Sequence, residues 1–462
     1  MFLKLLYRAV FVLTVCFFVT QPIAAVRPQE FPELEPFSKE DRVLILAPHP
    51  DDEDLGCGGA MQRALKAGAQ VKVVYLTCGD NNIFSIVFYN KLFFPFRLLS
   101  LRKKDFITLG HQRVHEAINA MKILGIQESD LIFLGYPDHG TDQMFIANWD
   151  HERPYRSSFS GHSTVPYEES VGYQKEFTAD NIITDLKQII FGYKPTKVFV
   201  TSPSDVNGDH WANYLYLMTA LSDLGQRIPA PKIYPYLIHV PGWPLPRHYH
   251  PSLEIEPPSK FFGDTLGLVN WRQLKLTEEE IDKKYKAMRA YDTQFRISGF
   301  YLTAFVRQNE LFGEFPYINL KKQYTSGSSG KQSKEVVFTS DMQWIGYAIV
   351  DNVLWVKAKK PKEYKQRLSY FFGIFGCRKD TLFAEMPNIL VFARYNKLSI
   401  FNGTTDKYIH PEGAFLEFNP ESVILKIPLS VLGNPESILF SFESSKAYLP
   451  SGCTAFRVIT LE

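Results

Sequence analysis

Residues 42–53 read RVLILAPHPDDE, a strand-like run that leads directly into a cluster of ionisable side chains. The first part, residues 42–48, is a continuous apolar run of the kind seen in parallel strands that are buried on both faces. A helical pattern over residues 55–67 follows and stops at Gly68, a common helix terminator. The run QVKVVYLT at residues 70–77 then predicts a second strand. This order of strand, helix and strand is typical of a parallel sheet.

The same alternation continues along the first two thirds of the chain. Strand-like runs occur at residues 130–137 and 197–203, and helical periodicity occurs at residues 113–124 and 179–191. A long helix is expected over residues 278–310. These elements predict an α/β domain over residues 38–323, with a Rossmann-like, doubly wound and mainly parallel sheet.

The sequence changes character after residue 323. Residues 324–335, YTSGSSGKQSKE, have the polar, Gly- and Ser-rich composition of a linker. Short strand-like runs separated by turn residues follow at residues 336–339, 344–350, 353–358, 389–395, 423–427, 438–442 and 456–460. The pattern predicts an all-β sandwich over residues 336–462. Its strands resemble those of sandwich modules that bind carbohydrate, and a structural or docking role is the alternative.

The first 25 residues have the layout of a secretory signal peptide. Two basic residues, Lys4 and Arg8, precede an apolar run at residues 9–19, and Ala24 and Ala25 offer a cleavage point. We therefore expect export to the periplasm or the extracellular space, with cleavage near Ala25. An uncleaved membrane anchor is the alternative.

Charge and cysteine content narrow the class of protein further. The formal net charge is only +2, whereas a dedicated nucleic-acid binder carries a larger and clustered basic surplus. No cysteine pair has the CxxC spacing of a metal site. Export permits disulfides, and a Cys377–Cys453 bridge is one pairing that the sequence leaves open.

Two polar clusters directly follow expected strands. His49, Asp51 and Asp52 come after the first strand, and the stretch SDVNGDH at residues 204–210 comes after a later one. Open parallel sheets bind ligands at the carboxyl ends of their strands. Acidic and imidazole side chains gathered there are costly unless a cation balances them. His210 would complete a His/Asp/His set, which suits a catalytic divalent metal.

These two motifs and three other segments resemble the PIG-L/LmbE superfamily of zinc-dependent N-acetylglucosamine de-N-acetylases. The other segments are RVHEAINAMKILG from Arg113, FLGYPDHG from Phe133 and KYKAMRAYDTQF from Lys284. The likeness spans about residues 42–312. It implies that the chain hydrolyses the N-acetyl amide of a sugar and uses zinc as its cofactor.

The resemblance also assigns roles by position. It implies that His49, Asp52 and His210 bind zinc, and that Asp51 is the general base that takes a proton from the attacking water. Arg113 matches a position near the substrate. Because histidine and aspartate ligands suit several metals, another divalent ion is an alternative to zinc.

One position departs from the family pattern. Many members have a histidine where this chain has Asn207, together with an aspartate equivalent to Asp209, and that histidine helps to stabilise the tetrahedral intermediate. Asparagine can donate a hydrogen bond to an oxyanion but cannot act as an acid. Two alternatives therefore stay open: a non-catalytic glycan-binding protein with a vestigial metal site, and a zinc amidase acting on another N-acyl amine.

Two further segments flank the expected site. In HVPGWPLPRHYH, residues 239–250, we expect His239 and Trp243 to line the substrate pocket, because sugars stack on aromatic faces. A second metal site there is conceivable, but a solvent-facing loop is the preferred interpretation. Residues 81–104 are rich in apolar and aromatic side chains and end in RKK, so they could touch a membrane or a lipid-linked substrate. A packed lid or a contact with the second domain is the preferred alternative.

Overall fold

The computed structural model describes most of the chain outside the N-terminal 30 residues. The described residues are 31–89, 101–258, 269–323, 336–342, 345–360, 368–394, 397–446, 449–453 and 456–461. The expected signal peptide and the expected linker at residues 324–335 lie outside them. Within the described part, no helix has both the length and the apolar character that crossing a bilayer requires.

The N-terminal domain is built on a five-stranded, fully parallel sheet, which confirms the expected Rossmann-like fold. The strands are β1 (Arg42–Ala47), β2 (Gln70–Thr77), β3 (Leu131–Tyr136), β4 (Lys197–Thr201) and β5 (Lys232–Tyr236). Their order across the sheet is β3-β2-β1-β4-β5. The chain therefore leaves β1 toward β2 and returns to β4 on the other side, which creates a topological switch point between β1 and β4.

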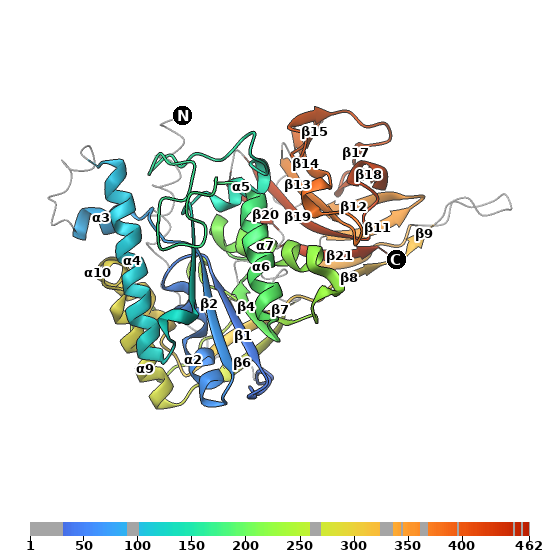
Figure 1. Ribbon diagram of the computed structural model, residues 1–462. Helices are drawn as coiled ribbons and strands as arrows, with labels where there is room; N and C mark the ends of the chain where they lie inside the picture. The colour runs from blue at the N-terminus through green and yellow to red at the C-terminus, as the bar shows by residue number, and fades with distance from the viewer. Residues whose placement is uncertain are drawn as a thin grey trace, which may run out of the picture.

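Helices cover both faces of this sheet, as Figure 1 shows. The helices α2 (Asp52–Lys66), α4 (Lys103–Leu124) and α9 (Glu278–Ala290) pack together on one face, and α6 (Ala179–Tyr193) and α7 (Gly208–Leu224) pack together on the other. Side-chain caps define several of their first turns. Thr178 accepts a hydrogen bond from the N–H of Asn181 at the start of α6, and Asn207 does the same for Asp209 in α7.

The single helix predicted over residues 278–310 is wrong. The helix α9 ends at Ala290, α10 (Asp292–Leu302) follows, and the chain then enters β7 (Asn309–Glu314), which pairs with β6 (Asn270–Lys275). Tyr291 breaks the helix with a ψ of 62°, and its buried hydroxyl donates to Glu53. Periodicity in the sequence cannot show such a break, because both helices keep an apolar face.

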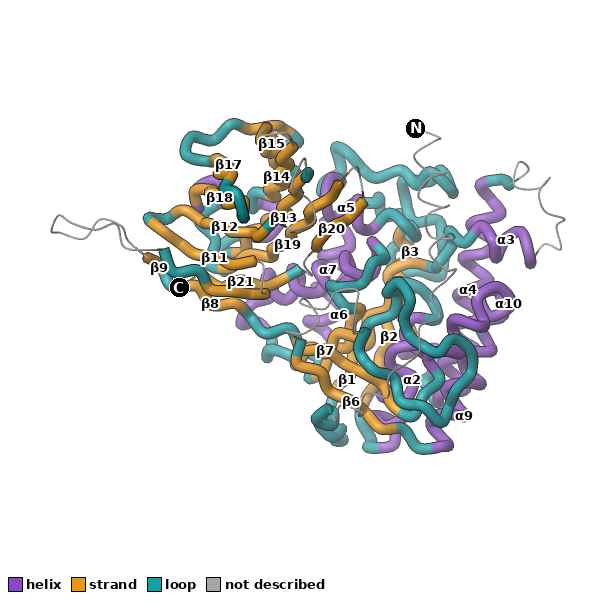
Figure 2. Tube along the Cα trace, turned by 180° about the vertical axis from the view of Figure 1, so that it is seen from behind, coloured by secondary structure: helices purple, strands orange, loops and turns teal. Residues whose placement is uncertain are grey.

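The C-terminal domain is a sandwich of two mainly antiparallel sheets, as predicted (Figure 2). One sheet contains β9 (Lys322–Gln323), β10 (Thr339–Met342), β11 (Ile345–Val350), β12 (Val353–Lys359), β17 (Phe415–Phe418) and β18 (Ser422–Pro428). The other contains β8 (Ile318–Leu320), β13 (Ser369–Cys377), β14 (Asn388–Arg394), β15 (Lys397–Asn402), β16 (Lys407–Ile409), β19 (Ser437–Lys446), β20 (Leu449–Cys453) and β21 (Arg457–Leu461). Alternate side chains of both sheets form one buried core between them. The short strands β8 and β9 precede the expected linker and already pair with strands of this domain.

The Cys377–Cys453 bridge that the sequence left open does not form. Cys377 is a free and buried thiol. On β19, Cys377 is paired with Ser437 and Cys453 with Glu443, six residues farther along the strand. At about 3.4 Å per residue this separates the two positions by roughly 20 Å, which is far beyond disulfide distance.

The two domains share part of one hydrophobic core. Phe145 of α5 (Thr141–Ala147) packs edge-on against Phe375 of β13, with 5.3 Å between ring centroids. Trp211 of α7 stacks on Phe456 at 5.3 Å. Figures 1 and 2 both show α5 and α7 beside the sheet that contains β13 and β19. The sandwich is therefore packed against the same side of the α/β domain as α6 and α7.

Candidate metal-dependent active site

The polar clusters meet at the switch point of the parallel sheet. His49, Asp51 and Asp52 follow β1, and residues 204–210 follow β4, its neighbour in the sheet. A third loop, which contains Asp138, follows β3. All three loops lie at the carboxyl ends of their strands, where ligands bind in open α/β sheets. The order of the strands thus brings together side chains that are far apart in the sequence.

Three side-chain atoms form a compact ligand set. His49 Nδ1 lies 3.1 Å from Asp52 Oδ2, His210 Nε2 lies 3.2 Å from the same oxygen, and the two ring nitrogens are 3.3 Å apart. Ligands about 2.0–2.1 Å from a tetrahedral metal lie about 3.3 Å from one another. His49, Asp52 and His210 are therefore arranged as three corners of a tetrahedral site and fit a divalent ion.

The second nitrogen of each histidine ring faces carboxylates. His210 Nδ1 lies 3.0 Å from Asp205 Oδ2, while His49 Nε2 lies 3.1 Å from Asp138 Oδ1 and 3.2 Å from Asp209 Oδ2. Carboxylates in this position orient a metal-binding imidazole and increase its basicity. Asp209 was expected to be a catalytic residue. In the structure, its side chain faces the ring of His49.

Asp209 is fully buried and held by several donors. Its Oδ2 accepts from the backbone N–H of His139 at 2.6 Å. Its Oδ1 accepts from the backbone N–H and the hydroxyl of Thr141, at 3.0 and 2.5 Å. These bonds tie the loop after β3 and the start of α5 to the first turn of α7, so the carboxylate has a fixed orientation.

The ligand set lies in a strongly negative environment. Burial alone would lower the pKa of His210, but Asp205 and Asp52 raise it to about 10. Burial also disfavours the charged form of His49, yet the surrounding carboxylates raise its pKa well above the ordinary value. A positive charge is therefore favoured here, whether protons or a divalent ion carry it.

Asp51 lies beside the ligand set and is held in an unusual backbone conformation. Its φ is 122°, a region that non-glycine residues rarely occupy and that is often found at functional sites. Burial raises the pKa of Asp51 to about 8, the nearby charge of Arg113 opposes this rise, and Asp52 adds to it. A carboxylate with this pKa can accept a proton near neutral pH.

Arg113 supports this loop from behind. Its guanidinium donates to the carbonyl of Pro50 at 2.6 Å and to the carbonyl of Gly79 at 2.9 Å, and it lies 3.4 Å from Asp51 Oδ1. Only 4% of Arg113 is exposed. Gly79 has a φ of 67°, and a Cβ there would lie 2.3 Å from the guanidinium, so another residue would strain this position. The family resemblance implies that Arg113 lies near the substrate. In the structure, Arg113 supports the loop that carries Asp51.

Asn207 caps α7. Its Oδ1 accepts from the backbone N–H of Asp209 at 2.9 Å, and its own N–H donates to Asp205 Oδ1 at 2.9 Å. The contacts of Asn207 therefore define the turn that carries His210 and Asp205.

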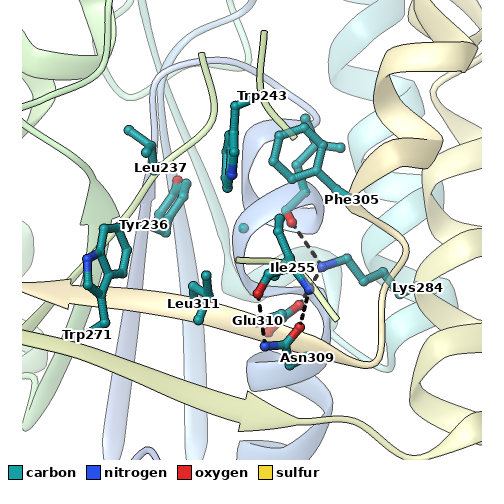
Figure 3. A pocket seen from close by; sticks show the side chains of 12 residues that line it. Tyr236, Leu237, Trp243, Ile255, Trp271, Lys284, Phe305, Asn309, Glu310 and Leu311 are labelled. Carbon is teal, nitrogen blue, oxygen red and sulfur yellow. Dashed lines mark hydrogen bonds and ion pairs between the residues drawn. The ribbon is translucent and has the colours of Figure 1, made fainter. Parts of the chain in front are cut away.

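His239 and Trp243 occupy different surroundings. The ring of His239 lies 4.7 Å from that of His210, and burial together with the charge of His210 lowers its pKa to about 4. Trp243 is only 7% exposed, and its indole N–H donates to the carbonyl of Glu256. Figure 3 shows Trp243 lining a small interior cavity with Tyr236 and Phe305. The structure thus brings His239, but not Trp243, to the ligand set.

The segment at residues 81–104 begins in contact with α10. Asn82 donates to the side chain of Gln294, and Ser85, in α3 (Ile83–Tyr89), donates to the carbonyl of Thr293. Residues 90–100 lie outside the described part of the chain. At residues 239–250, neither His248 nor His250 joins a group of metal-ligating side chains among the described residues.

Three further residues belong to the site and were not singled out in the sequence. They are Asp138 and Asp205, which face the ligand histidines, and His139. The ring of His139 lies 6.4 Å from that of His49, and 56% of its side chain is exposed. The segments FLGYPDHG and SDVNGDH contained all three, but no spacing in the sequence indicated which rings they would face.

Comparisons with known proteins match the part of the chain that contains the ligand set. Residues 44–221 match the PIG-L family, described as GlcNAc-PI de-N-acetylase. The 1D-myo-inositol 2-acetamido-2-deoxy-alpha-D-glucopyranoside deacetylase of Kribbella flavida is 27% identical over 312 residues, which cover 63% of this chain and 95% of that protein. The enzyme of the same name from Streptomyces scabiei is 33% identical over 121 residues, or 26% of this chain and 34% of that protein. Among solved structures, the N,N'-diacetylchitobiose deacetylase of Pyrococcus horikoshii has 16% identity and a TM-score of 0.34, over 57% of this chain and 75% of that one.

Proposed function

We propose that this chain, whose residues 44–221 form a PIG-L family domain, is a metal-dependent hydrolase that removes the N-acetyl group from an N-acetylglucosamine-containing sugar or glycoconjugate. The observation that carries the proposal is the ligand set of His49, Asp52 and His210, with Asp51 beside it at the switch point of the sheet. The named relatives are deacetylases, which are hydrolases of amide bonds. Together these features support hydrolysis of an acetamide.

Zinc is the metal that we propose for the site. Two imidazole nitrogens and one carboxylate oxygen with tetrahedral spacing suit zinc, and they leave a fourth position for water or substrate. The same ligands also accept other divalent ions. When bound, the metal would polarise the acetamide carbonyl and acidify water.

The chain's own groups supply the remaining steps of the reaction. Asp51 takes the proton of the attacking water and returns it to the departing amine nitrogen. Arg113 fixes the loop that carries Asp51, through the carbonyls of Pro50 and Gly79. Asp205 orients His210, and Asp138 and Asp209 orient His49. Asn207 fixes the turn that carries His210.

The direct test is release of free amine from a panel of N-acetylglucosamine compounds by the metal-loaded protein. The key variant is Asp51→Asn, which keeps the size of the side chain but cannot accept the proton. Asp130→Asn is a matched control, because Asp130 pairs with Lys72 at the opposite end of the sheet. We expect activity that requires metal, is lost by at least 100-fold in Asp51→Asn, and is unchanged in Asp130→Asn.

Each alternative predicts a different result. Metal binding without amine release from any compound would favour a glycan-binding protein with a vestigial metal site. Release from non-sugar N-acyl amines, but not from sugars, would favour a zinc amidase with another substrate. Full activity of Asp51→Asn would remove Asp51 from its proposed role as the base.

Three further parts of the chain complete the proposal. We propose export because of the signal-like composition of residues 1–25, and a band shift to the mature size in a secreting host would test it. Contact of residues 81–104 with a membrane or a lipid-linked substrate is tested by vesicle co-sedimentation of a variant with a shortened loop. Carbohydrate binding by the sandwich is supported by two exposed rings, Phe392 and Tyr408, which are 42% and 66% exposed.

A further inference from the structure

The loop that follows β5 holds an arginine side chain without an acidic partner among the described residues. The guanidinium of Arg247 lies over the ring of Tyr301, 4.6 Å from its centroid. Its Nη1 atom is buried and has no hydrogen-bond partner in the part of the chain that the structure describes. Leaving a buried charged donor unpaired costs free energy, so such an atom points to a ligand that would pair with it.

Arg247 is connected to the metal site through a row of neighbouring side chains. The hydroxyl of Tyr301 donates to the carbonyl of Ile238 at 2.8 Å and lies 3.3 Å from His239 Nδ1. The ring of His239 in turn lies 4.7 Å from the ring of the metal ligand His210. Arg247 therefore stands at the outer end of a row of contacts that begins at the metal site.

The loop around Arg247 is fixed by several hydrogen bonds. Arg307, which is fully buried, donates to the carbonyl of Pro246 at 2.5 Å and to the carbonyl of His250 at 3.2 Å. His248 has a φ of 73° and donates its backbone N–H to the carbonyl of Phe300 at 2.8 Å. These contacts hold the backbone on both sides of Arg247. A guanidinium presented from a fixed backbone loses little freedom when it binds a ligand.

Several other arginines of the described chain lie beside a carboxylate. Arg63 pairs with Glu280 at 2.6 Å, Arg272 pairs with Glu314 at 2.6 Å, and Arg113 lies close to Asp51. The described residues place no carboxylate within ion-pair distance of Arg247. Planar guanidinium groups bind phosphate and carboxylate in a bidentate manner, which makes an anion the natural ligand.

We propose that Arg247 recognises a phosphate or carboxylate group on the substrate, on the part that lies away from the acetamide. This inference rests on the proposed function and specifies its substrate class: an anionic N-acetylated sugar rather than a neutral one. The contacts from His210 through His239 and Tyr301 connect the ligand set to Arg247. Phosphate and carboxylate share the required chemistry, and the two are separated by the choice of substrates in the test.

The first experiment compares values of kcat/KM for the metal-loaded protein. The substrates are N-acetylglucosamine, its 1-phosphate and 6-phosphate, and N-acetylmuramic acid, which carries a carboxylate. We expect at least a tenfold preference for one charged substrate, because charge-assisted hydrogen bonds contribute on this scale. Arg247→Gln should abolish the preference by lowering kcat/KM for the charged substrate only. Arg247→Lys should keep part of the preference. The better of the phosphate and carboxylate substrates identifies the anion.

A matched control variant is Arg289→Gln. Arg289 is exposed on α9 and also lies over an aromatic ring, with 5.5 Å to the centroid of Phe295. It has the same type of cation–π contact as Arg247 but lies in a different element. Its substitution should leave every ratio of charged to neutral substrate unchanged. Equal losses for charged and neutral substrates in Arg247→Gln, or no loss at all, would overturn the inference.

The second experiment measures binding without turnover. Calorimetry on metal-loaded Asp51→Asn gives the Kd of N-acetylglucosamine and of each charged sugar, with and without Arg247→Gln. Tighter binding of a charged sugar that depends on Arg247, in the absence of any amine release by the wild type, would support the anion site and refute the deacetylase proposal. Amine release whose preference for charged substrates does not depend on Arg247 would support the deacetylase proposal and refute the anion site. Identical Kd values for neutral and charged sugars would also overturn the anion site.

Discussion

At the scale of single residues, the candidate metal site gathers buried carboxylates around the place that a cation would occupy. Asp52, Asp138, Asp205 and Asp209 are all less than 10% exposed. Carboxylates buried this deeply are costly unless positive charge and hydrogen bonds compensate them. Hydrogen bonds from backbone N–H groups to Asp209 offset part of the cost of burying these carboxylates. A divalent ion between His49, Asp52 and His210 would offset most of the rest.

The carboxylate of Asp205 should control metal affinity without binding the metal. It fixes His210 through Nδ1 and accepts backbone N–H groups from Asn207, through Oδ1, and from Ile238 and His239, through Oδ2. We expect Asp205→Asn to weaken zinc binding by about 10–100-fold, since an amide oxygen is a poorer acceptor for the imidazole N–H. Competition against a chelator of known affinity measures this change, with Asp130→Asn as the control. An unchanged affinity would show that the orientation of His210 does not depend on Asp205.

The ligand residues could be predicted from the sequence, but the residues behind them could not. His49, Asp52 and His210 stand in motifs that directly follow strands, and strand ends meet at one edge of a parallel sheet. Asp138 also follows a strand, yet its role depends on which ring it faces, and that depends on side-chain packing. Trp243 was expected to line the substrate pocket, but it is only 7% exposed and packs in the core. The sequence cannot tell these two places apart for an aromatic residue near a site.

At the scale of elements, the first turn of α7 carries both a ligand and its support. Asn207 begins this helix by accepting the N–H of Asp209. We expect Asn207→Ala to lower the free energy of unfolding by about 1 kcal/mol, as measured by urea denaturation, because a capping bond is lost. The family resemblance predicts a different effect, a fall in kcat larger than the rise in KM.

A second substitution at this position separates the two roles. Asn207→Ser can still cap the helix but has no amide N–H group to donate. If capping is the main role, Asn207→Ser keeps both stability and kcat near the wild-type values. A stable Asn207→Ser protein with a much lower kcat would instead identify the amide as a donor to the reacting carbonyl.

The pairing of β1 with β4 is reinforced at one end by Asp41. This carboxylate contacts Lys197 Nζ at 2.6 Å and accepts from Thr196 Oγ1 at 2.8 Å and from the backbone N–H of Ser38 at 2.8 Å. Burial raises the pKa of Asp41, but the bonds from Lys197, Thr196 and Ser38 outweigh burial and bring the pKa below its ordinary value. A lowered folded-state pKa means that the stabilisation is present above the unfolded pKa of about 3.9 and is lost as pH falls through the folded pKa.

Asp41→Asn should therefore destabilise the protein at neutral pH more than in acid. We expect a loss of about 2 kcal/mol near pH 7, from the charged hydrogen bonds. The difference from wild type should shrink as the pH falls through and below about 4. Urea denaturation of both proteins at a series of pH values measures it. A difference that stays constant with pH would mean that the charge of Asp41 contributes nothing.

The elements themselves show where sequence patterns succeed and where they fail. The strands β1, β2 and β4 are buried apolar runs, and their positions were predicted to within about two residues. The break between α9 and α10 was missed, because it depends on Tyr291, whose hydroxyl reaches Glu53 in α2. The strand β13 was also missed, although its run SYFFGIFGC is buried along most of its length. A contact between distant segments is invisible to a local pattern.

At the scale of the whole molecule, the metal site joins three strand ends and two helices of the α/β domain. A ligand that binds the folded state but not the unfolded state stabilises it by mass action. We expect removal of the metal with a chelator to lower the free energy of unfolding by about 3–4 kcal/mol, relative to metal at about 100–1000 times its Kd. Thermal unfolding with and without metal measures the shift. His210→Ala should show no shift on addition of metal, and an equal shift in this variant would place the stabilising ion elsewhere.

The helix α5 connects the metal site to the C-terminal sandwich. Thr141 at its start donates two hydrogen bonds to Asp209, and Phe145 one turn later packs against Phe375 of β13. Phe375 is 1% exposed and Phe145 is fully buried. This contact between the domains is therefore a buried part of the core, and Phe145 lies one helical turn from Thr141, which donates to the carboxylate that faces His49.

This packing predicts that the two domains unfold together. Phe375→Ala should lower the free energy of unfolding by about 3–5 kcal/mol, because it leaves a cavity in a buried cluster of rings. Phe392→Ala is the matched control, since Phe392 lies on the neighbouring strand and is 42% exposed, so its loss should be small. Calorimetry should show one transition that moves to lower temperature in Phe375→Ala, together with weaker metal binding as α5 loses its support. Two separate transitions, with only the sandwich affected by Phe375→Ala, would show that the domains fold independently and that α5 carries no coupling between them.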